Sequence, residues 1–148
     1  MITVKKLGLE SIEEVKSLFF EVFTNEPWND DWSDPAQLHG YMEDLMGNRN
    51  SMTFGLYEDD SLTGLSMGSV MHWCRGKEYF IFELCIRADR QGKGLGTEFL
   101  KRIEEYCKCH EITHIFLQTE RTVPAYGFYK KNGFIELSEH ASLFKEFH

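Results

Sequence analysis

Apolar residues along the first third of the chain have the spacing of one strand followed by two helices. Residues 2–7 alternate enough to predict a strand. Residues 11–14 (SIEE) fit a capping box, and apolar residues at helical spacing then predict a helix that ends near Asn25. Asp34 followed by Pro35 predicts the start of a second helix, which Gly47 ends.

Strand patterns fill the middle of the chain. Residues 52–57 and 62–73 flank a polar turn, and residues 79–86 (YFIFELCI) are apolar on both faces except at Glu83, which is typical of a strand buried between two layers. The remaining segments are a helix opened by residues 92–96, a strand at 112–118, a short helix at 124–132, and closing strands at 134–137 and 142–147. The order βααβββαβαββ predicts one mixed α/β domain over residues 1–148, in which a right-handed crossover joins residues 79–86 and 112–118 as parallel strands.

Composition is that of an ordinary globular domain and narrows the function classes. The chain has 148 residues, 42% of them hydrophobic, and a formal net charge of −8. It has no apolar run of the roughly 20 residues that a membrane-spanning helix needs, and its first residues lack the apolar central region of a signal peptide. We therefore expect a cytoplasmic protein without a membrane partner. The acidic balance argues against nucleic acid, because a protein that neutralises phosphates usually carries a basic face.

The four cysteines are spaced unlike zinc ligands. Cys107 and Cys109 form the only close pair, and no second pair stands at a matching distance. We therefore expect no metal and reduced thiols, as in a cytosolic protein.

A glycine-rich turn carries the most informative chemistry. Residues 90–97 (RQGKGLGT) stand where the buried strand passes into an amphipathic helix. Glycines there allow backbone N–H groups to approach a ligand closely, and the helix N-terminus adds about half a positive charge, so phosphate is the natural ligand. The spacing does not fit a P-loop, because Lys93 precedes Gly94 with no hydroxyl in register, nor the dinucleotide fingerprint, because Thr97 stands where its third glycine belongs. The alternative is a glycine-bearing connection without a ligand.

Two motifs together resemble the GNAT superfamily of N-acetyltransferases. Gln91-x-x-Gly94-x-Gly96 after a buried strand is similar to the family's loop for the acetyl-CoA pyrophosphate, and residues 125–134 (AYGFYKKNGF) resemble its second signature. The order of elements matches across nearly the whole chain. The resemblance implies acetyl-CoA as the cosubstrate and a central mixed sheet in which two parallel strands splay apart.

The resemblance also implies which residues bind acetyl-CoA. Main-chain groups of the splayed strand would hydrogen-bond the pantetheine arm, one of its N–H groups would polarise the thioester carbonyl, and N–H groups of the glycine-rich turn would hold the pyrophosphate. These residues are Leu84, Cys85, Ile86, Gln91, Gly92, Lys93, Gly94, Leu95, Gly96 and Thr97. Thr122 occupies the place where the family often has an asparagine that contacts CoA.

Tyr129 and Glu83 are the candidate catalytic residues. Tyr129 matches the family tyrosine that protonates the departing CoA thiolate, and the alternative is a tyrosine packed beside Phe128. Glu83 is the sole charged residue in its strand segment, and burial would raise its pKa toward that of a general base for an ammonium group. The alternatives for Glu83 are an exposed or paired carboxylate, with the amine deprotonated through a chain of waters.

The connection between the first two helices is the candidate acceptor site. In the family, acceptor specificity comes mainly from those helices and their connection, which here holds two tryptophans and several carboxylates that together suit a cation. The predicted acceptor-binding residues are Trp28, Asp30, Asp31, Trp32 and Trp73, with Tyr41 and His72 beside them. The alternative is a loop whose tryptophans pack against the core and whose acids are solvated.

The predicted function is transfer of an acetyl group from acetyl-CoA to a primary amine of a small cationic molecule, by direct attack in a ternary complex. The alternatives are an acetyltransferase for a protein or peptide amine and a catalytically silent acyl-CoA-binding regulatory module. The apolar closing strands, with Leu143, Phe144 and Phe147, also favour edge pairing in a homodimer.

Overall fold

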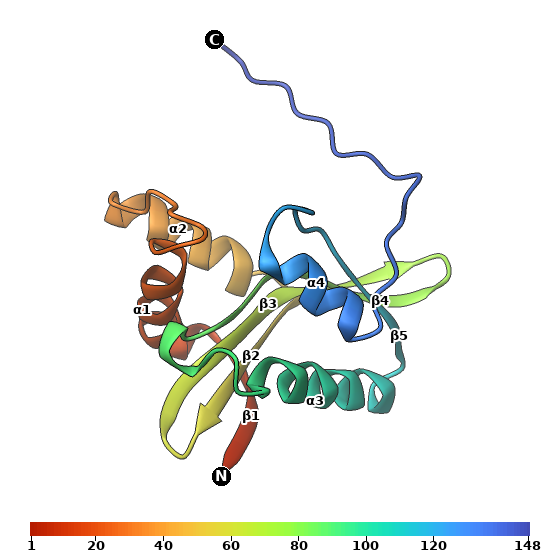
Figure 1. The fold of residues 1–148 in the computed structure, drawn as a ribbon, viewed down its shortest axis with the longest axis horizontal. Helices are drawn as coiled ribbons and strands as arrows, with labels where there is room; N and C mark the ends of the chain where they lie inside the picture. The colour runs from red at the N-terminus through yellow and green to blue at the C-terminus, as the bar shows by residue number, and fades with distance from the viewer. The chain divides into compact units, whose positions relative to one another are not determined.

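A five-stranded sheet in the order β1-β2-β3-β4-β5 lies at the centre of residues 1–118 in the computed structural model, which describes residues 1–148 (Figure 1). β1 to β4 pair antiparallel, and β4 pairs with β5 in parallel. The strands are β1 (Ile2–Leu7), β2 (Ser51–Glu58), β3 (Ser61–Trp73), β4 (Gly76–Ile86) and β5 (Ile112–Leu117). The mixed sheet and the parallel pair joined through a helix confirm the predicted fold class.

The chain forms two compact units, residues 1–118 and residues 119–148. The helices are α1 (Ile12–Phe23), α2 (Pro35–Met46), α3 (Leu95–Cys109) and α4 (Pro124–Lys131), with short 3-10 turns η1 (Leu9–Ser11) and η2 (Ala88–Arg90). The sheet and the first three α-helices belong to the first unit, and α4 belongs to the second. No helix combines the length and the apolar character that crossing a bilayer requires.

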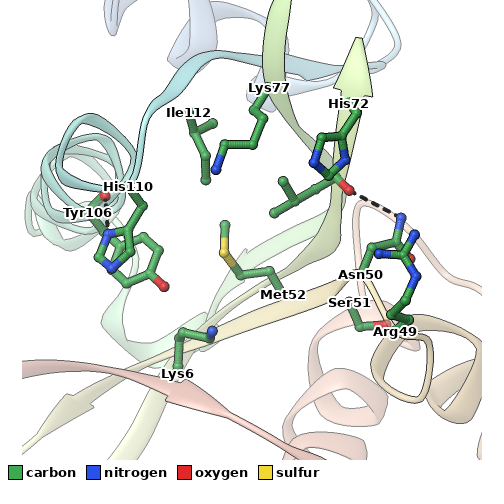
Figure 2. Close-up of a pocket in the computed structure, with 11 residues that line it drawn as sticks. Lys6, Arg49, Asn50, Ser51, Met52, His72, Lys77, Tyr106, His110 and Ile112 are labelled. Atoms are coloured by element: carbon green, nitrogen blue, oxygen red, sulfur yellow. Dashed lines mark hydrogen bonds between the residues drawn. The ribbon is translucent and has the colours of Figure 1, made fainter.

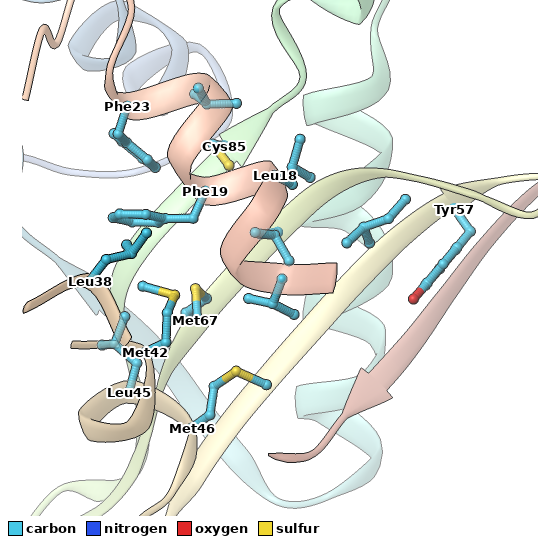
Figure 3. Close-up of a cluster of buried hydrophobic side chains, with 14 residues drawn as sticks. Leu18, Phe19, Phe23, Leu38, Met42, Leu45, Met46, Tyr57, Met67 and Cys85 are labelled. Atoms are coloured by element: carbon cyan, nitrogen blue, oxygen red, sulfur yellow. The ribbon is translucent and has the colours of Figure 1, made fainter. Parts of the chain in front are cut away.

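Helices cover both faces of the sheet in the first unit. α1 and α2 pack on one face around a core in which Val15, Phe19 and Met42 are at most 1% exposed (Figure 3). α3 packs on the other face, where Phe99 and Ile103 are fully buried. Burying a side chain of this size contributes about 1.5–3 kcal/mol, so the two cores hold the sheet between its helix layers.

A β-bulge interrupts the pairing of β4 with β3. Met67 pairs with Glu83, whereas the next residue of β3, Gly68, pairs with Ile81. Phe82 is therefore an extra residue in β4 that has no partner in β3.

The bulge changes which side chains of β4 point to which face. Before it, Ile81 lies in the α3 core, and after it Leu84 and Ile86 pack against that same core. Since side chains alternate along a strand, Glu83 and Cys85 are turned to the opposite face, under α1 and α2.

The two helix starts predicted from capping residues have different outcomes. Asp34 caps α2 as predicted, because its carboxylate accepts a hydrogen bond from the Ala36 N–H at 2.9 Å. The capping box predicted at residues 11–14 is wrong: the Ser11 side chain makes no cap hydrogen bond, and η1 leads the chain directly into α1.

The closing strands predicted at residues 134–137 and 142–147 are also wrong. A strand needs a neighbour to pair its N–H and C=O groups, and the sheet contains only β1 to β5. After α4, the Phe134 N–H donates to the Tyr129 carbonyl oxygen, and the remaining residues form no regular element. The large apolar side chains of this segment are exposed, namely Ile135, Leu137, Leu143, Phe144 and Phe147. Association of two copies through this segment stays a prediction.

Replacing Gly68 with Ala is expected to destabilise the fold by about 1–3 kcal/mol, the usual range for overpacking. The new Cβ would lie 2.0 Å from the Phe80 carbonyl oxygen, so the bulged backbone must shift. Gly40→Ala in the interior of α2 is the matched control, because a Cβ there meets no atom within 4 Å. We expect that control to be about 0.5–1 kcal/mol more stable than the wild type in urea unfolding. A Gly68→Ala protein of wild-type stability would contradict the bulge geometry.

Candidate active site

β4 and β5 stop pairing before β4 ends. Their parallel register finishes where Ile81 pairs with Leu117, and β4 continues to Ile86. Residues 83–86 therefore have a strand neighbour on the β3 side only, and the bulged Phe82 pairs with neither strand. An extended ligand with amide groups can pair with this edge like an added strand, since backbone N–H and C=O groups need partners. Residues 84–86, which we predicted to bind the pantetheine arm, lie on this free edge.

The glycine-rich turn between β4 and α3 presents its backbone to open space. Gly92 and Gly94 have φ angles of 74° and 81°, in the left-handed region that favours glycine, and a Cβ at either position would meet no atom within 4 Å. Gly94 is the N-cap of α3, and no side chain caps the first helical turn, which contains Leu95, Gly96 and Thr97. The N–H groups of this turn and the positive end of the helix dipole thus fit a pyrophosphate group.

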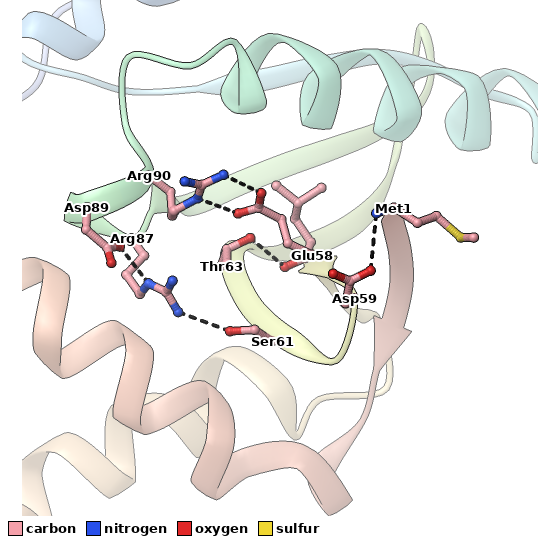
Figure 4. Close-up of polar contacts among 9 residues, drawn as sticks. Met1, Glu58, Asp59, Ser61, Thr63, Arg87, Asp89 and Arg90 are labelled. Atoms are coloured by element: carbon pink, nitrogen blue, oxygen red, sulfur yellow. Dashed lines mark hydrogen bonds and ion pairs between the residues drawn. The ribbon is translucent and has the colours of Figure 1, made fainter.

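Two arginines fasten the start of this turn to the β2–β3 hairpin (Figure 4). Arg90 donates two hydrogen bonds to the Glu58 carboxylate, at 2.7 and 2.6 Å, and these bonds lower the pKa of Glu58. The Arg87 side chain donates to the Ser61 hydroxyl at 3.1 Å, and its backbone N–H donates to the Thr63 carbonyl oxygen at 2.7 Å. The glycine-rich turn therefore leaves the sheet from a fixed point.

Gln91 fastens the turn to the strand that precedes it. Its side-chain amide donates to the Ile86 carbonyl oxygen at 2.9 Å, so this side chain orients the turn. Lys93 is exposed beside it and is free to contact a phosphate.

Glu83 is hydrogen-bonded to Tyr41 of α2. The Tyr41 hydroxyl donates to a Glu83 carboxylate oxygen at 2.5 Å, and the Tyr41 ring stacks on Trp32 with centroids 5.3 Å apart. Burial raises the pKa of Glu83, the Tyr41 hydrogen bond lowers it by less, and the Asp30 carboxylate raises it further. Burial and the Glu83 carboxylate raise the pKa of Tyr41 as well. A carboxylate with a raised pKa is suited to accept a proton from an ammonium group.

Comparison with known proteins shows the family of a chain that has this free strand edge and this glycine-rich turn. Residues 11–134 match the family model described as the acetyltransferase (GNAT) family. The chain belongs to the GNAT acetyltransferase family.

Individual relatives agree with this assignment. The uncharacterized N-acetyltransferase YobR of Bacillus subtilis (strain 168) is 31% identical over 88 residues, which are 59% of this chain and 34% of YobR. The match therefore spans about a third of the length of that curated relative. A possible acetyltransferase from Clostridium difficile 630 has a TM-score of 0.83 at 14% identity, over 100% of this chain and 99% of that one. The structure of AAC(6')-Iy with the bisubstrate analog CoA-S-monomethyl-acetylneamine has a TM-score of 0.74 at 13% identity, over 100% and 99% of the two chains. At these identities the two structures show that the fold is shared.

The tryptophans of the α1–α2 connection in this GNAT protein pack against the helices. The Trp28 ring lies 5.6 Å from the Phe23 ring, and the Trp32 ring lies 5.5 Å from the Phe19 ring. Trp32 also stacks on Tyr41, so it contacts the partner of Glu83 directly. Both tryptophans thus pack against the helices, as in the alternative given above for this loop. Trp32 is in addition adjacent to the Tyr41–Glu83 pair.

The two aspartates of the connection have different surroundings. The negative charge of Asp30, an exposed residue of the connection, raises the pKa of both Glu83 and Tyr41. Asp31 accepts a hydrogen bond from the Ser33 N–H at 3.0 Å, and its hydrogen bonding to Ser33 lowers its pKa. Asp30 therefore acts on Glu83 and Tyr41 through its charge, whereas Asp31 stabilises its own loop.

The structure does not bring Trp73 and His72 close to the Tyr41–Glu83 pair, which corrects the prediction for Trp73. Trp73 pairs with Gly76 at the tip of the β3–β4 hairpin and is 56% exposed. It lies six residues along β3 from Met67, the partner of Glu83, a separation of about 20 Å at 3.3 Å per residue.

The remaining predicted site residues lie in the second unit. Tyr129 of α4 is half-buried, and its ring lies 5.4 Å from that of Phe128 and 5.3 Å from that of Phe134. Thr122 is exposed just before α4. Their roles as general acid and CoA contact stay predictions from the family resemblance.

The pKa of Glu83 is expected to move in opposite directions in two variants. Tyr41→Phe removes a hydrogen bond that favours the carboxylate and should raise the pKa, whereas Asp30→Asn removes a negative charge and should lower it. Carbon-13 NMR titration of the side-chain carboxyl measures both, with Glu83→Gln identifying the signal. Shifts of the same sign in both variants would contradict the arrangement.

The raised pKa of Glu83 also makes the stability of the protein depend on pH. Because the pKa of Glu83 is higher in the folded protein than in the unfolded chain, its contribution to stability is present at low pH and falls as pH rises from 4.5 toward the folded pKa.

Proposed function

We propose that this protein transfers an acetyl group from acetyl-CoA to a primary amine of a small cationic molecule, by direct attack in a ternary complex. The observation that carries the proposal is the Tyr41–Glu83 pair, because Glu83 lies on β4, the strand that also offers a free edge at residues 82–86. A proton acceptor and a binding edge for an acyl-CoA thus occupy the same segment of β4.

The chain offers two backbone surfaces to acetyl-CoA, whose bound thioester would supply an activated acetyl group. The free edge at residues 84–86 would pair with the amides of the pantetheine arm, and the turn at residues 92–97 would bind the pyrophosphate. An N–H group at Leu84 or Cys85 would donate to the thioester carbonyl oxygen and stabilise the negative charge that develops there.

Charge and aromatic surface support a cationic acceptor. Glu83 is hydrogen-bonded to Tyr41, whose ring stacks on Trp32, and the negative charge of Asp30 acts on both Glu83 and Tyr41. Carboxylates with aromatic faces attract cations. The similar structure of AAC(6')-Iy with its CoA-S-monomethyl-acetylneamine analog supports a small amine as the acceptor class. Glu83 would take the proton that the ammonium group loses before its nitrogen attacks the acetyl carbon.

Direct attack is favoured over an acyl-cysteine route. Cys85 is 8% exposed, and burial together with the Glu83 charge raises the pKa of its thiol to about 12. The thiolate is the nucleophilic form and is scarce at neutral pH for a thiol of that pKa. Attack by the amine breaks the carbon–sulfur bond, and Tyr129 would then donate a proton to the departing thiolate.

Release of free thiol from acetyl-CoA across a panel of small polyamines, aminoglycosides and basic peptides tests the function. Glu83→Gln and Tyr129→Phe are each expected to lower kcat by about 10²–10⁴-fold, the usual contribution of a positioned acid or base. Tyr126→Phe, a second tyrosine on α4, is the matched control and should retain activity. Turnover with peptides alone would support the peptide alternative. Binding of acetyl-CoA without thiol release from any amine would support the regulatory alternative and reject catalysis.

The two neighbouring aspartates provide a charge-matched test of the acceptor site. Asp30→Asn is expected to raise the KM for the amine about fivefold, because a unit charge in contact with a cation contributes about 1 kcal/mol in water. Asp31→Asn removes the same charge one residue away and should leave KM nearly unchanged, since Asp31 faces Ser33. Steady-state kinetics with the best amine of the panel measures both. Equal KM values in the wild type and Asp30→Asn would remove this loop from the acceptor site.

A further inference from the structure

We propose that a basic pocket at the hairpin end of the sheet binds a small polyanion that carries phosphate or carboxylate groups. The pocket has a volume of about 280 Å³ and lies between the end of β1, the start of β2, the β3–β4 hairpin and the end of α3 (Figure 2). Its basic lining residues are Lys6, Arg49, His72, Lys77 and His110, and no Asp or Glu lines it.

The permanent cations of this basic pocket form no ion pairs, although the chain has an excess of acids. Outside the pocket, four of the other five arginines hold a carboxylate within hydrogen-bond distance, namely Arg87, Arg90, Arg102 and Arg121. Lys6, Arg49 and Lys77 have no such carboxylate, in a chain of net charge −8. Three like charges gathered around one cavity repel one another, and an anion bound between them would relieve that repulsion.

The cations surround an apolar base and polar walls. Figure 2 shows the amines of Lys6 and Lys77 on opposite sides of Met52, each pointing toward it. One wall is the Tyr106 ring, which stacks on the His110 ring with centroids 3.9 Å apart. Ammonium groups hydrogen-bond phosphate and carboxylate oxygens strongly, while the apolar and aromatic surface accommodates the carbon part of a ligand.

Opposing charges near the basic pocket are weaker than its cations. The C-terminal end of α3 contributes about half a negative charge, against three permanent positive charges. Glu78 follows Lys77, but its carboxylate lies 3.0 Å from the His114 ring nitrogen. The charge carried by the lining residues of the pocket is therefore positive.

The basic pocket is distinct from the candidate active site. Lys77 precedes Glu83 by six residues on β4, which is about 20 Å at 3.3 Å per residue. The length of α3 separates His110 from Gly94 by about 24 Å at 1.5 Å per residue. A ligand in this pocket therefore does not occupy the pyrophosphate turn.

Titration of the whole protein with pyrophosphate and, separately, with citrate tests this inference. We expect saturable shifts of the His72 and His110 imidazole NMR signals, because both side chains line the basic pocket. A double variant, Lys6→Gln with Lys77→Gln, should weaken binding at least about tenfold while keeping the side-chain stems. Lys93→Gln in the glycine-rich turn should leave both signals and their midpoints unchanged, which separates this pocket from the turn.

The two probes also identify the ligand class. Shifts with pyrophosphate alone assign a phosphate ligand, and shifts with citrate alone assign a polycarboxylate. If the double variant does not fold, loss of the wild-type shifts at high salt provides the second measurement, since salt screens exposed charges. The inference is overturned if neither probe moves the two signals, or if the double variant or high salt leaves the midpoint unchanged.

Discussion

The extra residue at Phe82 is the constraint on which the candidate active site depends. In a regular β4, Glu83 would share the face of Ile81 and enter the apolar α3 core, where an unpaired carboxylate is costly. The bulge turns Glu83 to the opposite face, where Tyr41 donates a hydrogen bond to it. A bulge also bends and twists its strand, and pairing with β5 ends at Ile81, directly before it. One local irregularity therefore accounts for the direction of the carboxylate and lies directly beside the free edge, which begins where β5 ends at Leu117.

The glycine-rich turn is preorganised by contacts outside itself. Arg90 and Glu58 join its start to the end of β2, and Gln91 joins it to the end of β4. These contacts leave the backbone of Gly92 and Gly94 without neighbours on its open side. A turn that is held in position before a ligand arrives loses less conformational entropy on binding, so less of the interaction energy is spent on ordering it.

The sequence predicted those parts of the structure that depend on local chemistry. The glycine-rich turn between β4 and α3, the cap at Asp34 and the order of the first nine α-helices and β-strands all follow from residues close together in the chain. The direction of Glu83 could not be predicted, because residues 79–86 are apolar on both sides and conceal the bulge.

Features that join distant segments also escaped prediction. Tyr41 was placed near the acceptor site, but its bond to Glu83 spans 42 residues of sequence. The basic pocket gathers Lys6, Arg49 and Lys77 from three separate segments, none of which carries a motif. The closing strands failed for the opposite reason, since alternating apolar residues describe a strand's faces without supplying the neighbour that it must pair with.

The way in which the α1–α2 connection is held has a consequence for how acceptor preference can diverge. Trp28 and Trp32 pack on the Phe23 and Phe19 rings of α1, and the Asp30 N–H donates to the Phe23 carbonyl oxygen at 2.8 Å. Between the tryptophans, Asn29 adopts a φ of 51°, a conformation that asparagine and glycine tolerate best. Position 30 can therefore vary in charge while the two indoles and the Asp31–Ser33 contact keep the backbone in place. If the proposed acceptor site is correct, directed evolution of new acceptors can begin with a library at this position alone.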